Sequence, residues 1–150
     1  MKRALIYILL TVAAILVPVE RTDLEKLKPV EAVYLGMEGE QVVICTDTED
    51  MGIGLTLEAA LQNLKETTSG IVYLDTADYL LIGPGGDQWV NAATDYIKGT
   101  TYVCTAVKGV DMGGAAAFLA VHTPECRLKD WEKGGFPPKL MVENGRYRLE

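Results

Sequence analysis

The side chains of this sequence come closest to supporting thiol chemistry or zinc binding. His122 is the single histidine, Cys126 follows it by four residues, and Cys104 lies in an earlier strand-like stretch. A Cys–His pair or a Ser–His–Asp triad would have to use His122, and the three side chains could together bind zinc. A structural zinc site needs four ligands, however, and no closely spaced cysteine pair exists. We therefore predict no catalytic residue, metal ligand or cofactor, and a thiol or zinc enzyme is the last-ranked hypothesis.

A glycine-rich loop offers a second kind of chemistry, the binding of a small ligand. Gly83, Gly85 and Gly86 follow an apolar strand and precede an expected helix, a position where phosphates are often bound. The G-x-G-x-x-G pattern fails at Gln88, and Asp87 would repel a phosphate. A tight strand-to-helix turn explains the glycines. A small-ligand site formed by this loop and Trp89 is kept as the alternative function.

Tryptophans and acidic clusters provide weaker signals. Trp89 lies on the apolar stripe of its expected helix, which favours core packing. Trp131 lies among charged residues, and an exposed tryptophan there would indicate a contact with a partner. The acidic run at residues 47–50 lacks the spacing of a calcium loop. We interpret this run as a solvated loop, and likewise the pair Asp75 and Asp78.

Composition narrows the class of protein. The chain has 150 residues, 49% of them hydrophobic and 23% charged, which is ordinary globular composition. Its formal net charge is −7, and no basic stripe is interleaved with aromatic residues, so nucleic-acid binding is disfavoured. Cys45, Cys104 and Cys126 form an odd set that allows one disulfide and a free thiol, or three free thiols.

The N-terminal segment predicts attachment to a membrane. Lys2 and Arg3 precede an uncharged run over residues 4–19, which would span about 24 Å as a helix. This pattern is typical of a signal peptide or an uncleaved signal anchor over residues 1–20. No clear cleavage site follows, so we favour a retained single-pass anchor, with a cleaved and secreted form as the alternative. The basic residues should stay cytoplasmic, which places the remainder of the chain outside the cell membrane.

The remaining residues predict one α+β domain. We expect a short stalk over residues 21–29, followed by a single extracytoplasmic domain over residues 30–150. Its expected strands are residues 30–36, 41–46, 71–74, 79–82 and 101–107, together with a C-terminal hairpin over 139–149 that turns at Asn144-Gly145. Its expected helices are residues 57–67, 88–98 and 112–122, capped by Thr56, Asp87 and Asp111. Residues 47–54 are expected to be a loop, and residues 127–133 one or two helical turns. The order predicts a mixed β-sheet with three helices packed on it.

Two stretches carry a resemblance to a known family. They are the helix and strands of residues 56–83, TLEAALQNLKETTSG followed by IVYLDTADYLLIG, and residues 101–119, TYVCTAVKGVDMGGAAAFL. Residues 30–82, which include the hairpin that precedes the first stretch, resemble the N-terminal domain of the Ger(x)C family, the C subunits of spore-germination nutrient receptors. These are membrane lipoproteins of Gram-positive bacteria. The lipid-bearing cysteine is missing here, so a helical anchor would replace the lipid.

The functional prediction combines these observations. The anchor, the lack of a catalytic constellation and the resemblance favour a non-enzymatic interaction or scaffold domain on the outer face of the membrane of a sporulating bacterium. The resemblance implies a membrane-protein partner and transfers no catalytic residues.

Overall fold

The computed structural model describes residues 27–150, and the predicted anchor over residues 1–20 lies outside them. Seven strands form the main sheet, in the order β4-β3-β2-β6-β7-β8-β9. Their bounds are Ala32–Glu38 for β2, Gln41–Thr46 for β3, Met51–Gly54 for β4, Tyr79–Ile82 for β6, Tyr102–Ala106 for β7, Lys139–Glu143 for β8 and Arg146–Leu149 for β9. Two further short strands, β1 (Leu27–Pro29) and β5 (Ile71–Tyr73), form a separate parallel pair.

The main sheet is parallel in its centre and antiparallel at both flanks. β2, β6, β7 and β8 run parallel to one another. β3 and β4 are added antiparallel on one side, and β9 is added antiparallel on the other. The predicted α+β class and mixed sheet are confirmed. The predicted hairpin turn is also confirmed, because Asn144 and Gly145 both adopt the positive φ angles that a type I′ turn requires.

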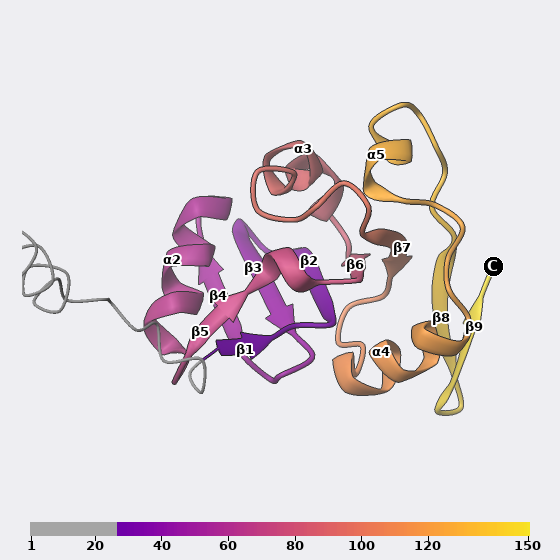
Figure 1. Cartoon of the computed structure of the whole chain (residues 1–150), viewed down its shortest axis with the longest axis horizontal. Coiled ribbons are helices and arrows are strands. Elements are labelled where there is room, and N and C mark those ends of the chain that lie inside the picture. Colours follow the sequence, from indigo (N-terminus) through magenta and orange to yellow (C-terminus); the bar gives the residue numbers. More distant parts are fainter. Residues whose placement is uncertain (1–26) are drawn as a thin grey trace, which may run out of the picture.

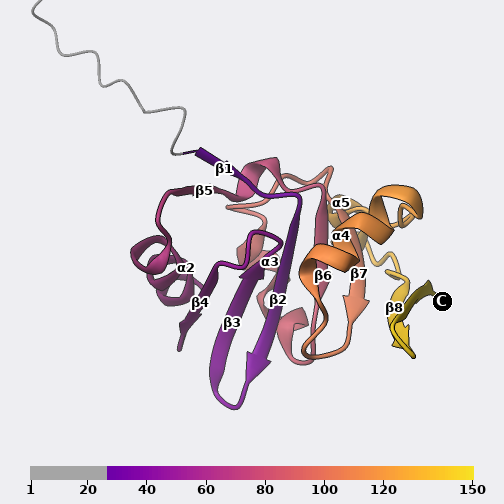
Figure 2. The same cartoon turned by 90° about the horizontal axis from the view of Figure 1, so that it is seen from below.

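Helices cover both faces of this sheet (Figures 1 and 2). The helices are α2 (Leu57–Thr67), α3 (Val90–Ala93), α4 (Met112–Val121) and α5 (Leu128–Trp131). Residues 27–150 thus hold four helices, and the one beyond the three expected helices is α5, which falls where one or two helical turns were expected. The apolar residues of α2, α3 and α5 join one buried cluster, and those of α4 join the cluster on the opposite face. No helix within this described range is both long and apolar enough to cross a bilayer.

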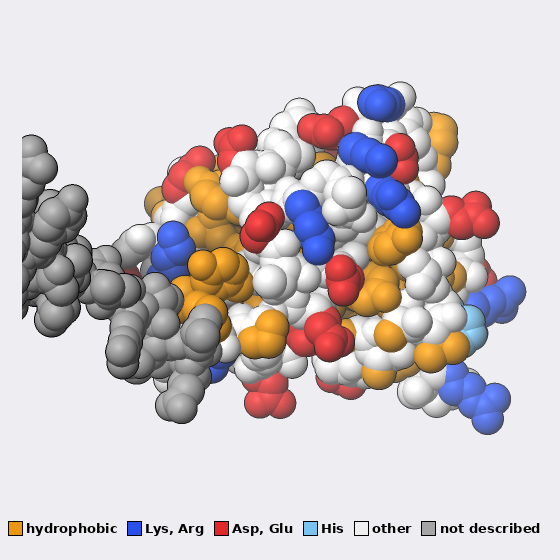
Figure 3. Space-filling model, viewed as in Figure 1, with side chains coloured by type: hydrophobic (Ala, Val, Ile, Leu, Met, Phe, Trp, Pro, Cys, Tyr) orange, Lys and Arg blue, Asp and Glu red, His pale blue; other side chains and the backbone are white. Residues whose placement is uncertain are grey.

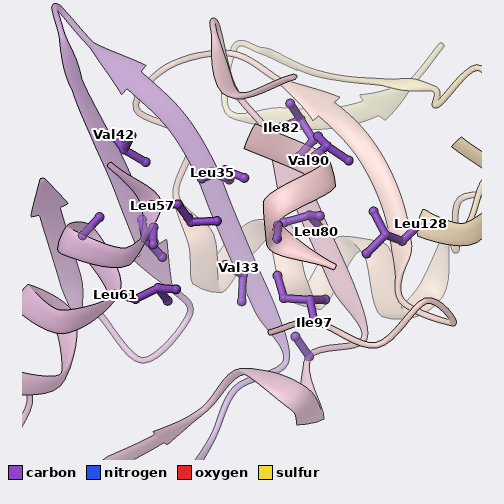
Figure 4. Packing of buried hydrophobic residues seen from close by; sticks show 14 of the residues in the cluster. Val33, Leu35, Val42, Leu57, Leu61, Leu80, Ile82, Val90, Ile97 and Leu128 are labelled. Atoms are coloured by element: carbon purple, nitrogen blue, oxygen red, sulfur yellow. The ribbon is translucent and has the colours of Figure 1, made fainter. Parts of the chain in front are cut away.

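Alternation along the central strands divides the core between the two faces. Leu80 and Ile82 of β6 enter the larger cluster, whereas Leu81 between them enters the α4 cluster. All three are almost fully buried, which confirms that β6 is covered on both faces. Figure 4 shows side chains of α2 and the sheet meeting in the larger cluster, with Leu57 and Leu61 directed towards Leu35 and Val33.

Helix α2 follows the sequence pattern closely. Thr56 caps it by accepting a hydrogen bond from the Ala59 amide, at 3.2 Å. The expected apolar stripe is the buried face, and it consists of Leu57, Ala60, Leu61 and Leu64. Helix α4 is likewise capped as predicted, with Asp111 accepting from the Gly114 amide at 3.1 Å.

Two predictions about local structure are wrong. Residues 51–54, expected to lie in a loop, form β4, whose glycines allow the backbone of α2 to approach this strand. The helix expected over 88–98 is reduced to a 3-10 turn at Gly86–Trp89 and one α-turn, α3, and Asp87 caps no helix. After Ala93 the Thr94 hydroxyl donates to the Asn91 carbonyl, a local bond that competes with helix continuation.

Candidate functional site

The glycines of the predicted ligand loop lie at the C-terminal ends of β2 and β6, where they are packed against β2. Gly83 lies under the ring of Tyr34, so closely that a Cβ atom there would be 1.9 Å from the tyrosine hydroxyl. A Cβ atom on Gly86 would be 2.1 Å from the Leu35 carbonyl oxygen. The Gly83 amide donates to that same Leu35 oxygen and the Gly86 amide to the Gly83 oxygen, at 2.8 and 3.0 Å. Two amides that could have bound an anion are therefore engaged within the protein.

The other two members of this predicted site also contact β2. Gly85 has a φ of +73°, and a Cβ atom there would approach the Met37 side chain within 2.8 Å. Trp89 is half-buried, and its indole Nε1 donates to the Met37 sulfur at 3.2 Å. The structure thus brings Gly83, Gly85, Gly86 and Trp89 together and gives each a packing role. Ligand binding by this loop stays a prediction.

The residues considered for thiol or zinc chemistry do not form a cluster. Cys104 is buried on β7, whereas His122 is exposed at the end of α4, where its ring stacks on Phe118 with centroids 4.4 Å apart. All three cysteines are free thiols. Within residues 27–150, no three His, Cys, Asp or Glu side chains lie close enough to hold a metal ion together.

The buried thiol of Cys104 makes a testable contribution to stability. Burial raises its pKa from 9.0 to about 12. Unfolding returns the pKa to the lower value, so between these two values the unfolded state binds fewer protons and stability falls as pH rises. The parent protein should therefore lose unfolding free energy between about pH 8 and about pH 10.5. The Cys104→Val variant should lose about 2 kcal/mol less over the same range.

Urea unfolding followed by tryptophan fluorescence at both pH values measures this difference. Burial also raises the pKa values of Cys45 and Tyr34, so part of the alkaline destabilisation should persist in the variant. An identical pH dependence in parent and Cys104→Val would show that the thiol titrates equally in the folded and unfolded chains.

The acidic cluster and Trp131 also have internal contacts. Asp47 accepts from the amides of Glu31 and Ala32 at 3.0 and 3.1 Å, and Asp50 forms an ion pair with Lys28 at 3.4 Å. Trp131, predicted as a partner contact, is half-buried and packs against the larger core cluster.

One edge of the main sheet is closed by helix α2, which lies along β4. The Ile53 amide donates to the side-chain oxygen of Asn63 at 3.0 Å, and the Thr67 hydroxyl donates to the Met51 carbonyl at 3.2 Å. Both backbone groups belong to the outermost strand, and both are bonded by side chains of α2. Strand addition at β4 is therefore blocked.

The opposite edge, strand β9, is open. Lys139 and Glu150 exchange both backbone hydrogen bonds, at 2.8 and 3.0 Å. In an antiparallel ladder such pairs alternate with pairs that are not bonded, so the backbone groups of Tyr147 and Leu149 point away from β8. No other strand among residues 27–150 pairs with this side of β9. The exposed edge thus presents two residues with free amide and carbonyl groups.

A groove and a protruding aromatic residue adjoin the end of this open strand. The groove has a volume of about 470 Å³, and its lining includes Pro124, Cys126, Pro137 and Leu149. Phe136 also lines it and is 94% exposed, the most exposed large hydrophobic residue of the described chain. An aromatic residue beside a partly apolar groove is typical of a binding surface.

The open edge carries two arginines and one glutamate. Arg146 and Arg148 project from β9 and are exposed, and Arg148 forms an ion pair with Glu150 at 3.5 Å. Both blue and red side chains project from this end of the molecule, at the right of Figure 3. Opposite-charge pairs across neighbouring strands are favourable, so this row of arginines suits a strand that carries carboxylates.

Sequence reasoning did not select the open edge or Phe136 as functional. The 139–149 pattern identified the hairpin, but its place at the end of the sheet depends on the strand order. Phe136 could have been noticed, because it stands alone between two glycines and two prolines, where no periodic apolar face can bury it. Comparison of the chain with protein-family models, curated proteins and solved structures found no match.

Proposed function

We propose that this protein is a membrane-anchored, non-enzymatic extracytoplasmic domain that binds an extended acidic segment of a membrane-protein partner. The segment would add a strand to β9 and continue over Phe136. One observation carries the proposal: α2 bonds to the outer groups of β4, whereas the outer groups of β9 at Tyr147 and Leu149 remain unpaired among the described residues. Strand addition is a common mode of peptide recognition, in which main-chain hydrogen bonds supply affinity.

Charge disfavours one way of pairing β9 with a second copy of this chain. Two β9 strands paired antiparallel about Tyr147 would place Arg146 opposite Arg148, and like charges directly across a ladder are destabilising, whereas pairing about Arg148 or Leu149 would place an arginine opposite Glu150. A segment with Asp or Glu at alternate positions would place carboxylates opposite both arginines, and it would compete with Glu150 for Arg148.

The anchor and the family resemblance support a partner in the same membrane. The uncharged run over residues 4–19 is the proposed anchor, and the likeness to C subunits of spore-germination receptors implies a membrane protein as neighbour. β1, where the described chain begins, and β9 lie at opposite ends of the domain (Figure 1). An anchor at residues 4–19 would therefore leave the open edge accessible to other extracytoplasmic segments.

Site-specific photo-cross-linking in cells that produce the protein tests this function. Benzoylphenylalanine replaces Phe136, a conservative change at a residue that is 94% exposed. We expect one discrete adduct whose cross-linked peptide is an acidic extracytoplasmic segment of a membrane protein. Placing the same probe at Leu55, which is 68% exposed next to the closed edge, is the matched control and should give no adduct.

Neutralising the charge at the edge separates strand addition from contact with Phe136 alone. The double variant Arg146→Gln/Arg148→Gln leaves the probe in place and removes two favourable cross-strand pairs without setting a new carboxylate opposite Glu143 of β8, so the adduct yield should fall about fivefold. Equal adduct yields with and without the two arginines would refute strand addition at β9, and the arginines would then serve only to keep an open edge soluble.

A further inference from the structure

A small apolar patch lies at the end of the domain opposite β9. It consists of Ile71 and Tyr73 of β5 and Tyr96 after α3, which are 44%, 46% and 37% exposed. These residues border one shallow groove of about 450 Å³ together with Lys65, Asp75 and Asp95. Hydrophobic side chains gather at the left end of the molecule in Figure 3, in the region of β5. We refer to Ile71, Tyr73 and Tyr96 as the β5 patch.

The β5 patch adjoins the place where the chain enters the domain. β1 pairs with β5 in parallel, so Leu27 is the direct partner of Ile71 and Pro29 is the partner of Tyr73. The uncharged run ends at Val19, and seven residues, 20–26, separate it from Leu27. The eight steps from Val19 to Leu27 cover at most about 29 Å when the chain is fully extended. The β5 patch therefore cannot lie far from wherever the uncharged run is held.

The composition of the β5 patch fits the headgroup region of a bilayer. Tyrosine places an apolar ring beside a polar hydroxyl and is enriched at membrane–water interfaces. Ile71 adds an aliphatic side chain from the same strand as Tyr73. The charged residues of the groove are one lysine and two aspartates, so anionic lipids would not attract this surface. Apolar and aromatic contact would supply the attraction.

We infer that the β5 patch rests on the headgroup region of the membrane in which residues 4–19 are anchored. This inference depends on the anchoring part of the proposed function. Contact at the β5 patch in addition to the tether would fix the orientation of the domain, with β9 and its arginines directed away from the lipid. The open edge would then face other extracytoplasmic segments and not the bilayer surface.

Fluorescence quenching on the full chain tests the contact. The chain is reconstituted in phosphatidylcholine vesicles that carry a spin label on the lipid headgroup, and vesicle flotation is checked first. Tyr73→Trp adds a reporter to the β5 patch, and Phe136→Trp adds a matched reporter at the far end, on the same background of Trp89 and Trp131. We expect the emission added by Tyr73→Trp to fall by at least half with spin-labelled lipid, and that added by Phe136→Trp to be unchanged.

The outcomes separate this inference from the anchor itself. Flotation with equal quenching of both reporters, or with none of either, would overturn the contact and leave the anchor intact. Failure to float would overturn both the anchor and the contact. A blue-shifted Tyr73→Trp reporter in lipid-free protein would indicate that residues 4–19 cover the β5 patch within the same chain, which also overturns the inference.

Discussion

Replacing Gly52 with valine should lower the free energy of unfolding by about 3 kcal/mol or more. A Cβ atom at this position would be 2.2 Å from the Ala60 carbonyl oxygen and 2.8 Å from the Leu64 amide nitrogen. Both are backbone atoms of α2, so no change of side-chain rotamer relieves the overlap. The helix would have to move away from β4 and lose burial along the face that includes Leu61. The better strand propensity of valine offsets only a fraction of this loss.

Urea unfolding of the full chain in non-ionic detergent, followed by tryptophan fluorescence, measures this effect. Met51→Val is the matched control, because Met51 belongs to the same strand and is 50% exposed, so its effect should stay within about 0.5 kcal/mol. Displacing α2 also breaks the bonds from Asn63 and Thr67 to β4, so Gly52→Val should associate at concentrations where the parent stays monomeric. A stable, monomeric Gly52→Val protein would contradict the account of the closed edge.

The elements with strong periodicity could be predicted from the sequence, and those determined by tertiary contact could not. The stripe from Leu57 to Leu64 and the Thr56 cap are local signals, and the helix they predicted is present with its expected bounds. Met51–Gly54 has no such signal. Its glycines are typical of a loop by propensity, and they are tolerated in a strand because α2 needs the space that a side chain would occupy.

The candidate site illustrates the same limit at the level of the sheet. Asn144-Gly145 identifies a hairpin at any place in a fold. Whether its outer strand is an edge depends on the strand order, which results from contacts between residues far apart in sequence, such as the pairing of Thr105 with Lys139. The glycine-rich loop shows the converse case. The sequence located it correctly between strand and turn but could not show that Tyr34, almost fifty residues earlier, lies over Gly83.

Gly83→Ala should destabilise the protein by about 2 kcal/mol, and Tyr34→Leu should relieve much of that loss. The new methyl group would lie 1.9 Å from the Tyr34 hydroxyl and 2.3 Å from the ring carbon that carries it. Tyr34 is only 6% exposed, so its ring cannot move into solvent without uncovering the α4 face of the sheet. Leucine is shorter and would leave room for the methyl group. The same urea titration measures both single variants and the double variant.

The thermodynamic cycle formed by these variants decides what the glycine at position 83 is for. If packing under Tyr34 explains it, the double variant should be at least about 1 kcal/mol more stable than the sum of the two single effects predicts, because residues in direct contact do not act additively. If Gly83 instead leaves space for a ligand, Gly83→Ala should unfold like the parent and the cycle should close with no coupling. A measured coupling near zero together with a stable Gly83→Ala protein would therefore favour the loop as a ligand site, and a large coupling would assign its first glycine to the core.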